Sequence, residues 1–291
     1  MPVKNLRRKV AVGIGLGAFL FLTACWIAGS VLSAPARRVV GDLPPGLTGR
    51  SVQFQSDSGA TLRGWLLPGR KGAGAILLLH GVRGSRLQML ERARFLSSAG
   101  YAVLLFDFQA HGESTGDAIT NGYLESRDAR AAVEFLRSNS AGEKIGIIGV
   151  SMGGAATLLS DPPLPADAIV LEMVYPTIEQ AISNRLTMRL GGWASVLTPL
   201  LTVQLKLRAG ISADALHPIA HAGKATAPKL FIAGSEDRHT TLNESKELFA
   251  VAAEPKELWV VEGAGHVDAH VFTAQEYERR VVLFFEQHLR R

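Results

Sequence analysis

Short, predominantly apolar runs recur along the chain, and amphipathic stretches separate most of them. The runs lie at residues 75–79, 101–106, 144–150, 168–174, 229–233 and 257–261. A strand buried on both faces of a sheet needs such a run, whereas a surface helix needs an apolar stripe every three to four residues. Helices are predicted over residues 87–98, 124–137, 153–160 and 274–289. This alternation predicts an α/β fold, with a mostly parallel twisted sheet covered by helices on both faces.

Two segments depart from the alternation. Residues 51–55 and 62–67 flank the turn at 57–59 and predict an antiparallel hairpin, which starts a single α/β domain over residues 50–291. Residues 176–227 contain no predicted strand and carry many Leu and Val side chains. We interpret them as a small helical cap, and the alternative is an ordinary helical excursion packed on the sheet.

The first 38 residues predict a membrane segment. Residues 10–32 contain no charged side chain and are long enough to cross a bilayer as a helix. Lys4, Arg7, Arg8 and Lys9 precede this run, so we expect the N-terminus to be cytoplasmic and the domain to be extracytoplasmic. Residues 39–49 hold two prolines and three glycines without periodicity and predict a linker.

Three interpretations of this N-terminal segment stay open. It is an uncleaved anchor, a secretory signal cleaved after Ala36, or a lipoprotein signal in which residues 22–25 form a lipobox and Cys25 is lipidated. All three place the domain outside the cytoplasm, and the first and third keep it tethered to the membrane. Cys25 is the only cysteine, so no intramolecular disulfide can form.

Charge and histidine spacing argue against several classes of partner. The formal net charge is +5, and much of the excess lies near the chain ends, so no basic face for nucleic acid is expected. His217 and His221 are spaced like metal ligands, but Pro218 lies between them. Residues 266–270 also resemble a metal motif. We expect neither a metal nor another cofactor.

The strongest chemical motif is Gly-x-Ser-x-Gly at residues 149–153. An apolar run precedes it and a small-residue helix follows it, which is the strand–turn–helix that holds a nucleophilic serine on a tight turn. Larger side chains at Gly149 and Gly153 would collide with the neighbouring strand and helix. We therefore interpret Ser151 as a nucleophile; the alternative is a serine that merely caps the helix.

A nucleophilic serine requires a base and an acid that orients it. His266 follows the last predicted strand, and Asp237 follows the preceding one, so both are expected at the carboxyl edge of the sheet. We predict that His266 is the base and that Asp237 is the acid. Glu236, Asp268 and Glu172 are the alternative acids.

Acyl transfer also requires donors for an oxyanion. The residue after the nucleophile, Met152, and Val82 in the turn after the strand 75–79 are predicted to supply backbone N–H groups. His80 is interpreted as a structural histidine that holds this turn.

From about residue 50 to its end, the chain resembles the α/β-hydrolase superfamily, and within it the membrane-anchored Bem46-like serine hydrolases. More loosely, it is similar to the serine aminopeptidase and monoglyceride-lipase-like branches. The resemblance lies in residues 80–81, 107–114, 149–153 and 265–266. The second of these motifs commonly reads Asp-x-Arg-Gly-x-Gly-x-Ser, and here Gln109 and Ala110 replace the Arg and the Gly.

The resemblance implies a serine hydrolase with an α/β-hydrolase fold. Membrane tethering and an apolar cap favour an acyl-ester or lipid-like small-molecule substrate. A serine peptidase is the alternative enzyme, and a non-catalytic binding protein on the same fold is the alternative of another class. The oligomeric state, the acyl chain and the head group are not predicted.

Overall fold

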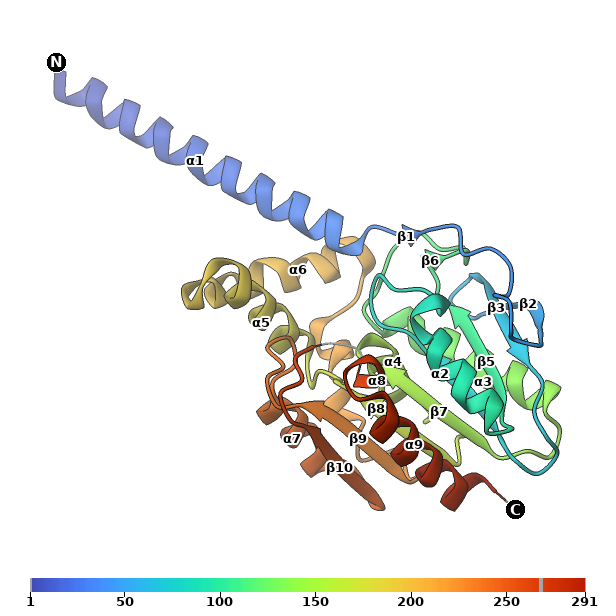
Figure 1. The fold of residues 1–291 in the computed structure, drawn as a ribbon. Helices are drawn as coiled ribbons and strands as arrows, with labels where there is room; N and C mark the ends of the chain where they lie inside the picture. The colour runs from blue at the N-terminus through green and yellow to red at the C-terminus, as the bar shows by residue number, and fades with distance from the viewer. Residues whose placement is uncertain (1, 267–268, 291) are drawn as a thin grey trace.

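The computed structural model describes residues 2–266 and 269–290, which form an eight-stranded sheet, nine α-helices and shorter elements (Figure 1). The strand order is β10-β9-β8-β7-β4-β5-β3-β2. Every neighbouring pair is parallel except β2–β3 and β3–β5. The strands are β2 (Arg50–Gln55), β3 (Thr61–Leu67), β4 (Ala75–Leu79), β5 (Ala102–Asp107), β7 (Ile145–Val150), β8 (Ala168–Glu172), β9 (Lys229–Gly234) and β10 (Lys256–Val261).

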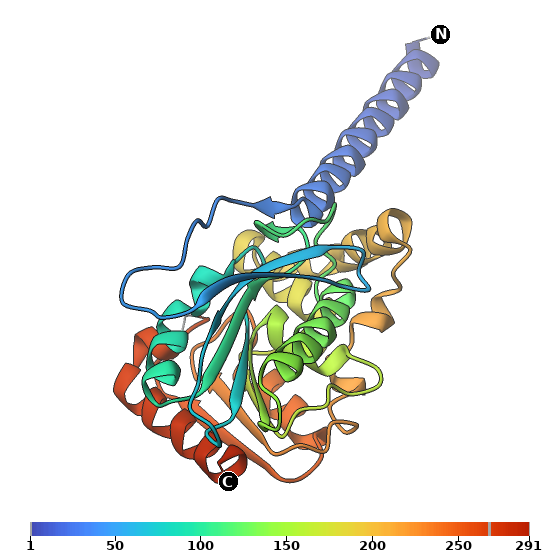
Figure 2. The same ribbon diagram turned by 90° about the vertical axis from the view of Figure 1, so that its right-hand side faces the viewer.

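Helices cover both faces of this sheet (Figure 2). On one face, α2 (Leu90–Ser98) and α9 (Ala274–Leu289) pack against the aliphatic side chains of β4, β5 and β7. On the other face lie α3 (Tyr123–Asn139), α4 (Met152–Leu159) and α7 (Leu242–Val251). The central strands β4, β5 and β7 are buried along their whole length, as their unbroken apolar runs predict.

Between β8 and β9 the chain forms a helical excursion that projects beyond the sheet. It comprises α5 (Ile178–Leu190), η2 (Gly192–Leu197), α6 (Thr198–Ala209), η3 (Ala213–Leu216) and η4 (Pro218–Ala220). In Figure 1 the first three of these lie apart from the strands, below the N-terminal helix. We call α5, η2 and α6 the cap.

The N-terminal helix α1 (Pro2–Ser33) extends away from the domain (Figure 1). Within it, Lys9–Ser33 is long and apolar enough to cross a membrane. An 18-residue window of this stretch has a mean hydropathy of 2.2, and none of that window is buried against the protein. This apolar helix has the properties of a membrane anchor or of a signal sequence.

The predicted strands and helices are all present, with ends that differ by a few residues. The structure adds a two-stranded parallel pairing of β1 (Ala36–Arg37) with β6 (His111–Gly112). The sequence does not predict either strand, because two residues are too few to show an alternation of apolar and polar side chains. Residues 39–49, the predicted linker, contain no helix or strand.

Candidate active site

Ser151 lies between the end of β7 and the start of α4. Its backbone φ is +50°, a strained value for a residue with a side chain. A Cβ on Gly149 would lie 2.6 Å from the backbone of Gly154, and a Cβ on Gly153 would lie 2.3 Å from the carbonyl oxygen of Leu79. The predicted collisions with the helix and the strand are therefore confirmed, and they explain why both positions are glycine.

Asp237 and His266 meet on adjacent loops that follow β9 and β10. The Nδ1–H of His266 donates to Oδ2 of Asp237 across 2.7 Å. The other oxygen of Asp237 accepts the backbone N–H groups of His239 (2.7 Å) and Thr240 (2.9 Å). The carboxylate is fully buried, whereas the imidazole is 19% exposed. This arrangement directs the other ring nitrogen, Nε2, away from the carboxylate.

Ser151 lies at the carboxyl edge of the same sheet, because β7 to β10 are successive neighbours. Among the described residues, no hydrogen bond joins the Ser151 hydroxyl to His266. Such bonds are often long before substrate binds and shorten in the reacting complex.

The alternative acids differ from Asp237 in their surroundings. Glu172 is buried and receives two hydrogen bonds from Arg92, at 2.7 and 3.1 Å, and another from the Tyr277 hydroxyl. Its carboxylate therefore belongs to a buried ion pair in the core. The side chain of Glu236 is exposed to solvent, and Asp268 lies outside the described residues.

The predicted oxyanion donors lie on two segments that flank Ser151. Met152 is the first residue of α4, so its N–H has no acceptor within the helix. Val82 follows Gly81, and a Cβ on Gly81 would lie 3.7 Å from the Cβ of Ser151. The turn after β4 therefore passes directly beside the serine.

Two buried histidines hold this turn in place. The Nδ1–H of His80 donates to the carbonyl of Gly81, and its Nε2 accepts the N–H of Phe108. Burial, with the nearby His111, lowers the pKa of His80 to about 3, so the ring is neutral. The Nε2 of His111 accepts the N–H of Arg83 at 3.0 Å. The structural role predicted for His80 is confirmed, while the similar role of His111 was not predicted.

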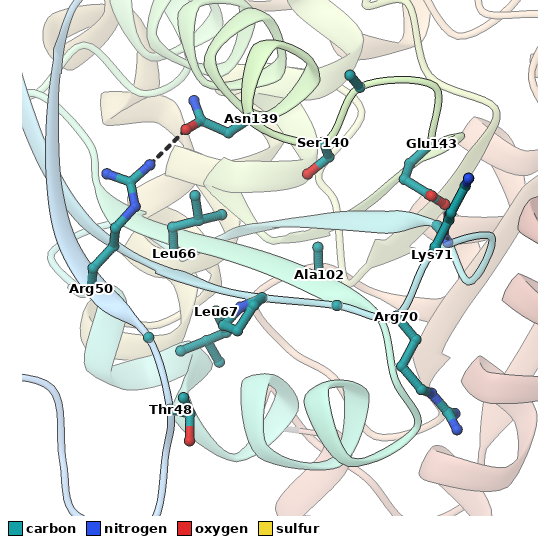
Figure 3. Close-up of a pocket in the computed structure, with 15 residues that line it drawn as sticks. Thr48, Arg50, Leu66, Leu67, Arg70, Lys71, Ala102, Asn139, Ser140 and Glu143 are labelled. Carbon is teal, nitrogen blue, oxygen red and sulfur yellow. Dashed lines mark hydrogen bonds between the residues drawn. The ribbon is translucent and has the colours of Figure 1, made fainter.

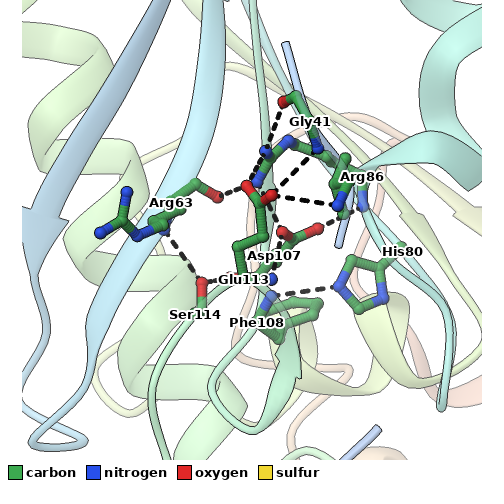
Figure 4. A network of polar contacts seen from close by, with 9 residues as sticks. Gly41, Arg63, His80, Arg86, Asp107, Phe108, Glu113 and Ser114 are labelled. Carbon is green, nitrogen blue, oxygen red and sulfur yellow. Dashed lines mark hydrogen bonds and ion pairs between the residues drawn. The ribbon is translucent and has the colours of Figure 1, made fainter. Parts of the chain in front are cut away.

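A largely buried network of charged groups also supports this turn (Figure 4). Arg86 donates from Nη1 to the buried carboxylate of Asp107 at 2.6 Å and from Nη2 to Glu113 at 2.5 Å. Asp107 also accepts the backbone N–H of Arg86 at 2.6 Å. The motif at 107–114 pointed to this region, but no sequence signal identified Arg86 as its partner.

Glu113 connects this network to the segment that follows the N-terminal helix. It accepts the backbone N–H groups of Val40 and Gly41, each at 3.0 Å. Burial opposes ionisation of Glu113, but these hydrogen bonds and Arg86 outweigh burial and lower its pKa to about 2.

The two departures from the family motif change this loop locally. Ala110 adopts a φ of +58°, a conformation in which glycine is free of strain. The side chain of Gln109 donates to the carbonyl of Ala118 (2.6 Å) and to Glu125 (2.9 Å), so it ties the loop to α3. As predicted, both positions shape the loop.

The surroundings of the His266 ring are histidine- and arginine-rich. His239 stacks on it with ring centroids 4.8 Å apart. Burial lowers the pKa of His239, and the nearby His266 and the arginines Arg185 and Arg189 lower it further, whereas Asp237 raises it. Both arginines belong to α5, so the cap brings positive charge toward this edge of the sheet.

Among the histidines with metal-like spacing, His217 and His270 each form a hydrogen bond with a glutamate. His217 forms a 2.8 Å hydrogen bond with Glu179, and Asp214 lies near them, with potential ligand atoms of all three within 4.8 Å of one another. The side chains of all three residues are at least partly exposed to solvent. His270 bonds through Nε2 to Glu278 at 2.8 Å.

A large cavity of about 620 Å³ lies at the other end of the sheet (Figure 3). It is lined by Leu66 and Leu67 at the end of the antiparallel strand β3, and by Gly74 and Ala102 at the starts of β4 and β5. None of the predicted catalytic residues lines it. Ligand sites of open α/β sheets form at the carboxyl ends of the strands, so this cavity is not the candidate active site.

Comparison with known proteins agrees with the fold and its motifs. Residues 76–280 match the model of the alpha/beta hydrolase family. An uncharacterized protein of Mycobacterium tuberculosis is 31% identical over 224 residues, which cover 76% of this chain and 73% of that protein. The uncharacterized protein YqkD of Bacillus subtilis is 27% identical over 237 residues, covering 78% and 76%. An esterase of Pyrococcus furiosus superposes with a TM-score of 0.71 at 25% identity, covering 87% of this chain and 97% of that one. The chain therefore belongs to the alpha/beta hydrolase family.

Proposed function

We propose that this hydrolase cleaves carboxylic esters with acyl or lipid-like chains, through an acyl-enzyme on Ser151. The observation that carries the proposal is the 2.7 Å hydrogen bond between His266 and the buried Asp237, on the sheet edge where Ser151 occupies a strained turn. Such a bond orients an imidazole with Nδ1 protonated and Nε2 available as a base. The likeness to an esterase supports ester substrates.

In the proposed reaction, Nε2 of His266 takes the hydroxyl proton as Oγ of Ser151 attacks the ester carbonyl. Asp237 stabilises the imidazolium that forms. The N–H groups of Val82 and Met152 donate to the carbonyl oxygen as it becomes an oxyanion. His266 then protonates the leaving alcohol. A water molecule, deprotonated by His266, releases the acyl group and restores the serine.

A serine peptidase of the same fold is the second candidate. An aminopeptidase requires carboxylates that bind the terminal ammonium of its substrate. Arg185 and Arg189 instead bring positive charge toward His239, which stacks on His266. This charge favours neutral or anionic ester substrates over peptides with a free terminal amine.

We also propose that α1 anchors the protein as a single-pass helix, with the domain on the extracytoplasmic side. The length and apolarity of Lys9–Ser33 and the basic residues before it support this topology.

The proposed function is tested by labelling the full chain with a fluorophosphonate probe, followed by assays with p-nitrophenyl esters of increasing chain length and with amino-acid nitroanilides. We expect covalent labelling at Ser151 and turnover of esters only. Absence of labelling would favour a non-catalytic binding protein. Turnover of nitroanilides without esters would establish the peptidase.

A further inference from the structure

We propose that the apolar outer face of the cap is embedded in the same bilayer as α1, so that acyl substrates enter the active site laterally from the membrane. The embedding rests on the proposed anchor, and the substrate route rests on the proposed esterase function. The two parts are separated in the experiment below.

The cap presents an unusual concentration of large apolar side chains to the exterior. Between residues 188 and 207, six of them are between 44% and 71% exposed. They are Met188, Leu190, Trp193, Val196, Val203 and Leu207. Exposed apolar side chains concentrated in one short segment favour a partner, because leaving them in water is unfavourable.

The cap is joined directly to the helix proposed to cross the membrane. Gln204 of α6, itself nearly buried, donates to the backbone carbonyl of Cys25 at 3.1 Å. Arg208 donates to the carbonyl of Trp26, and its guanidinium lies 3.8 Å from the centre of the Trp26 ring. Figures 1 and 2 both show α6 beside the domain-proximal end of α1.

These contacts set the depth of the cap relative to the bilayer. Lys9 and Trp26 are about 26 Å apart along α1, since each helical residue adds about 1.5 Å. This length is close to the thickness of a hydrocarbon core, about 30 Å. Trp26 then lies at the boundary where Trp and Arg side chains are enriched. Because α6 contacts Cys25 and Trp26, it lies at the same boundary.

The charges of the cap match a lipid surface. Residues 188–209 contain three basic residues, Arg189, Lys206 and Arg208, and no acidic residue. Apolar side chains combined with basic ones are typical of helices that lie in the membrane interface and attract anionic head groups. A bilayer containing anionic lipid is therefore the partner that this face fits.

Within the cap, α5 contacts the segment beside the candidate active site. Asn184 of α5 donates to both carboxylate oxygens of Glu244 and to the carbonyl of His239, next to the Asp237 loop. The cap therefore connects the membrane boundary with the edge of the sheet that carries Ser151. The proposed lateral route of the acyl chain follows this connection.

The embedding is tested with the full chain reconstituted in vesicles of phosphatidylcholine and phosphatidylglycerol. In a Cys25→Ser background, an environment-sensitive fluorophore is attached at Trp193→Cys or Leu207→Cys. Leu283→Cys on α9 is the matched control, because Leu283 is also about half exposed but lies far from the cap. We expect nitroxide-labelled lipids to quench the cap labels at least threefold more than the control. Quenching equal to the control would overturn the embedding, and so would labels shielded from both lipid and aqueous quenchers, which would indicate a second copy of the chain.

The route is tested with Leu207→Glu and with Leu283→Glu as its control. We expect Leu207→Glu to lower turnover of a vesicle-embedded long-chain ester about tenfold and to leave turnover of soluble p-nitrophenyl acetate within twofold of wild type. Equal turnover of the embedded ester by both variants would overturn the lateral route. If the wild type cleaves no ester, the proposed function fails, whereas the quenching result still decides the embedding.

Discussion

The guanidinium of Arg83 donates a hydrogen bond to the backbone carbonyl of Val31, across 3.1 Å. Val31 lies in the last turn of α1, and Arg83 follows Val82, the proposed oxyanion donor. Arg38 strengthens the connection by donating to the carbonyl of Arg83 at 2.7 Å. The end of the apolar helix is thus joined to the turn beside Ser151. Within this turn, the backbone of Arg83 adopts a strained φ of +58°.

Arg83→Ala is expected to lower kcat for p-nitrophenyl acetate about tenfold with KM nearly unchanged, because a displaced donor weakens transition-state stabilisation more than substrate binding. The melting temperature should change little, since Arg83 is exposed. Arg94→Ala, which removes a surface ion pair with Glu91, is the control. An unchanged kcat would show that Arg83 does not position the turn.

Ser151→Ala is expected to reduce ester turnover by on the order of 10⁴-fold or more and to abolish fluorophosphonate labelling. The fold should be retained, because the change removes only a hydroxyl group. Steady-state kinetics and circular dichroism measure the two effects. Turnover within tenfold of wild type, from folded protein, would assign the nucleophile elsewhere.

Asp237→Asn is expected to reduce kcat by about 10³- to 10⁴-fold, because an amide in this place favours the wrong tautomer of His266. Glu172→Gln provides the contrast. It should destabilise the protein by about 3 kcal/mol, because it removes the carboxylate of a buried ion pair, with a far smaller effect on kcat. The comparison requires kcat and denaturant unfolding of both variants. A larger kcat defect in Glu172→Gln would identify the acid on β8 instead.

His80 makes stability depend on pH. Its pKa is about 3 in the folded protein and 6.5 in the unfolded chain, so between these values the unfolded chain binds the extra proton. The contribution of neutral His80 to the free energy of unfolding is complete above pH 6.5. It is lost as the pH falls below this value, at about 1.4 kcal/mol per pH unit. Unfolding free energies at about pH 7 and pH 5.5 measure this slope. His80→Gln should show a shallower slope than wild type, and equal slopes would refute the assignment.

The intact protein is expected to remain in membranes after carbonate and high-salt washing, because a spanning apolar helix is inserted almost irreversibly. Protease added from the extracytoplasmic side should digest the domain. The Cys25→Ser variant distinguishes an uncleaved anchor from a lipoprotein. If α1 is an uncleaved anchor, the apparent mass of the protein stays the same. If Cys25 is lipidated, the substitution blocks processing and the apparent mass increases. Recovery of soluble protein that starts after Ala36 would establish a cleaved signal.

Much of the fold follows from local patterns that the sequence displays directly. The apolar runs at β4, β5 and β7 predict buried strands because every side chain of a central strand contacts a covered face. The strained turn at Ser151 is equally local, since Gly149 and Gly153 are required by atoms of the adjoining helix and of the neighbouring strand. Such features depend on residue type and short spacing, and both are visible in one sequence.

Which carboxylate pairs with His266 required the three-dimensional structure. Asp237, Glu236 and Glu172 all occur near the ends of neighbouring strands, and spacing alone cannot tell which carboxylate turns toward His266. The loop after β9 directs Asp237 to the imidazole and Glu236 to solvent, while Arg92 and Tyr277 hold Glu172 in the core. The position of each carboxylate depends on the direction of its side chain and on hydrogen-bond partners that are distant in the sequence.

The same reason explains why the contacts of the N-terminal segment were not predicted. Arg83 contacts Val31, Glu113 contacts Val40, and Arg208 contacts Trp26, and each pair is separated by 52 or more positions in the sequence. No periodicity encodes such pairs, because each depends on how complete elements pack. The sequence by itself determined the order of strands and helices and the strained serine turn, through local sterics and hydrophobic pattern. Only the tertiary structure decided which distant groups support that turn, because packing, not spacing, brings them together.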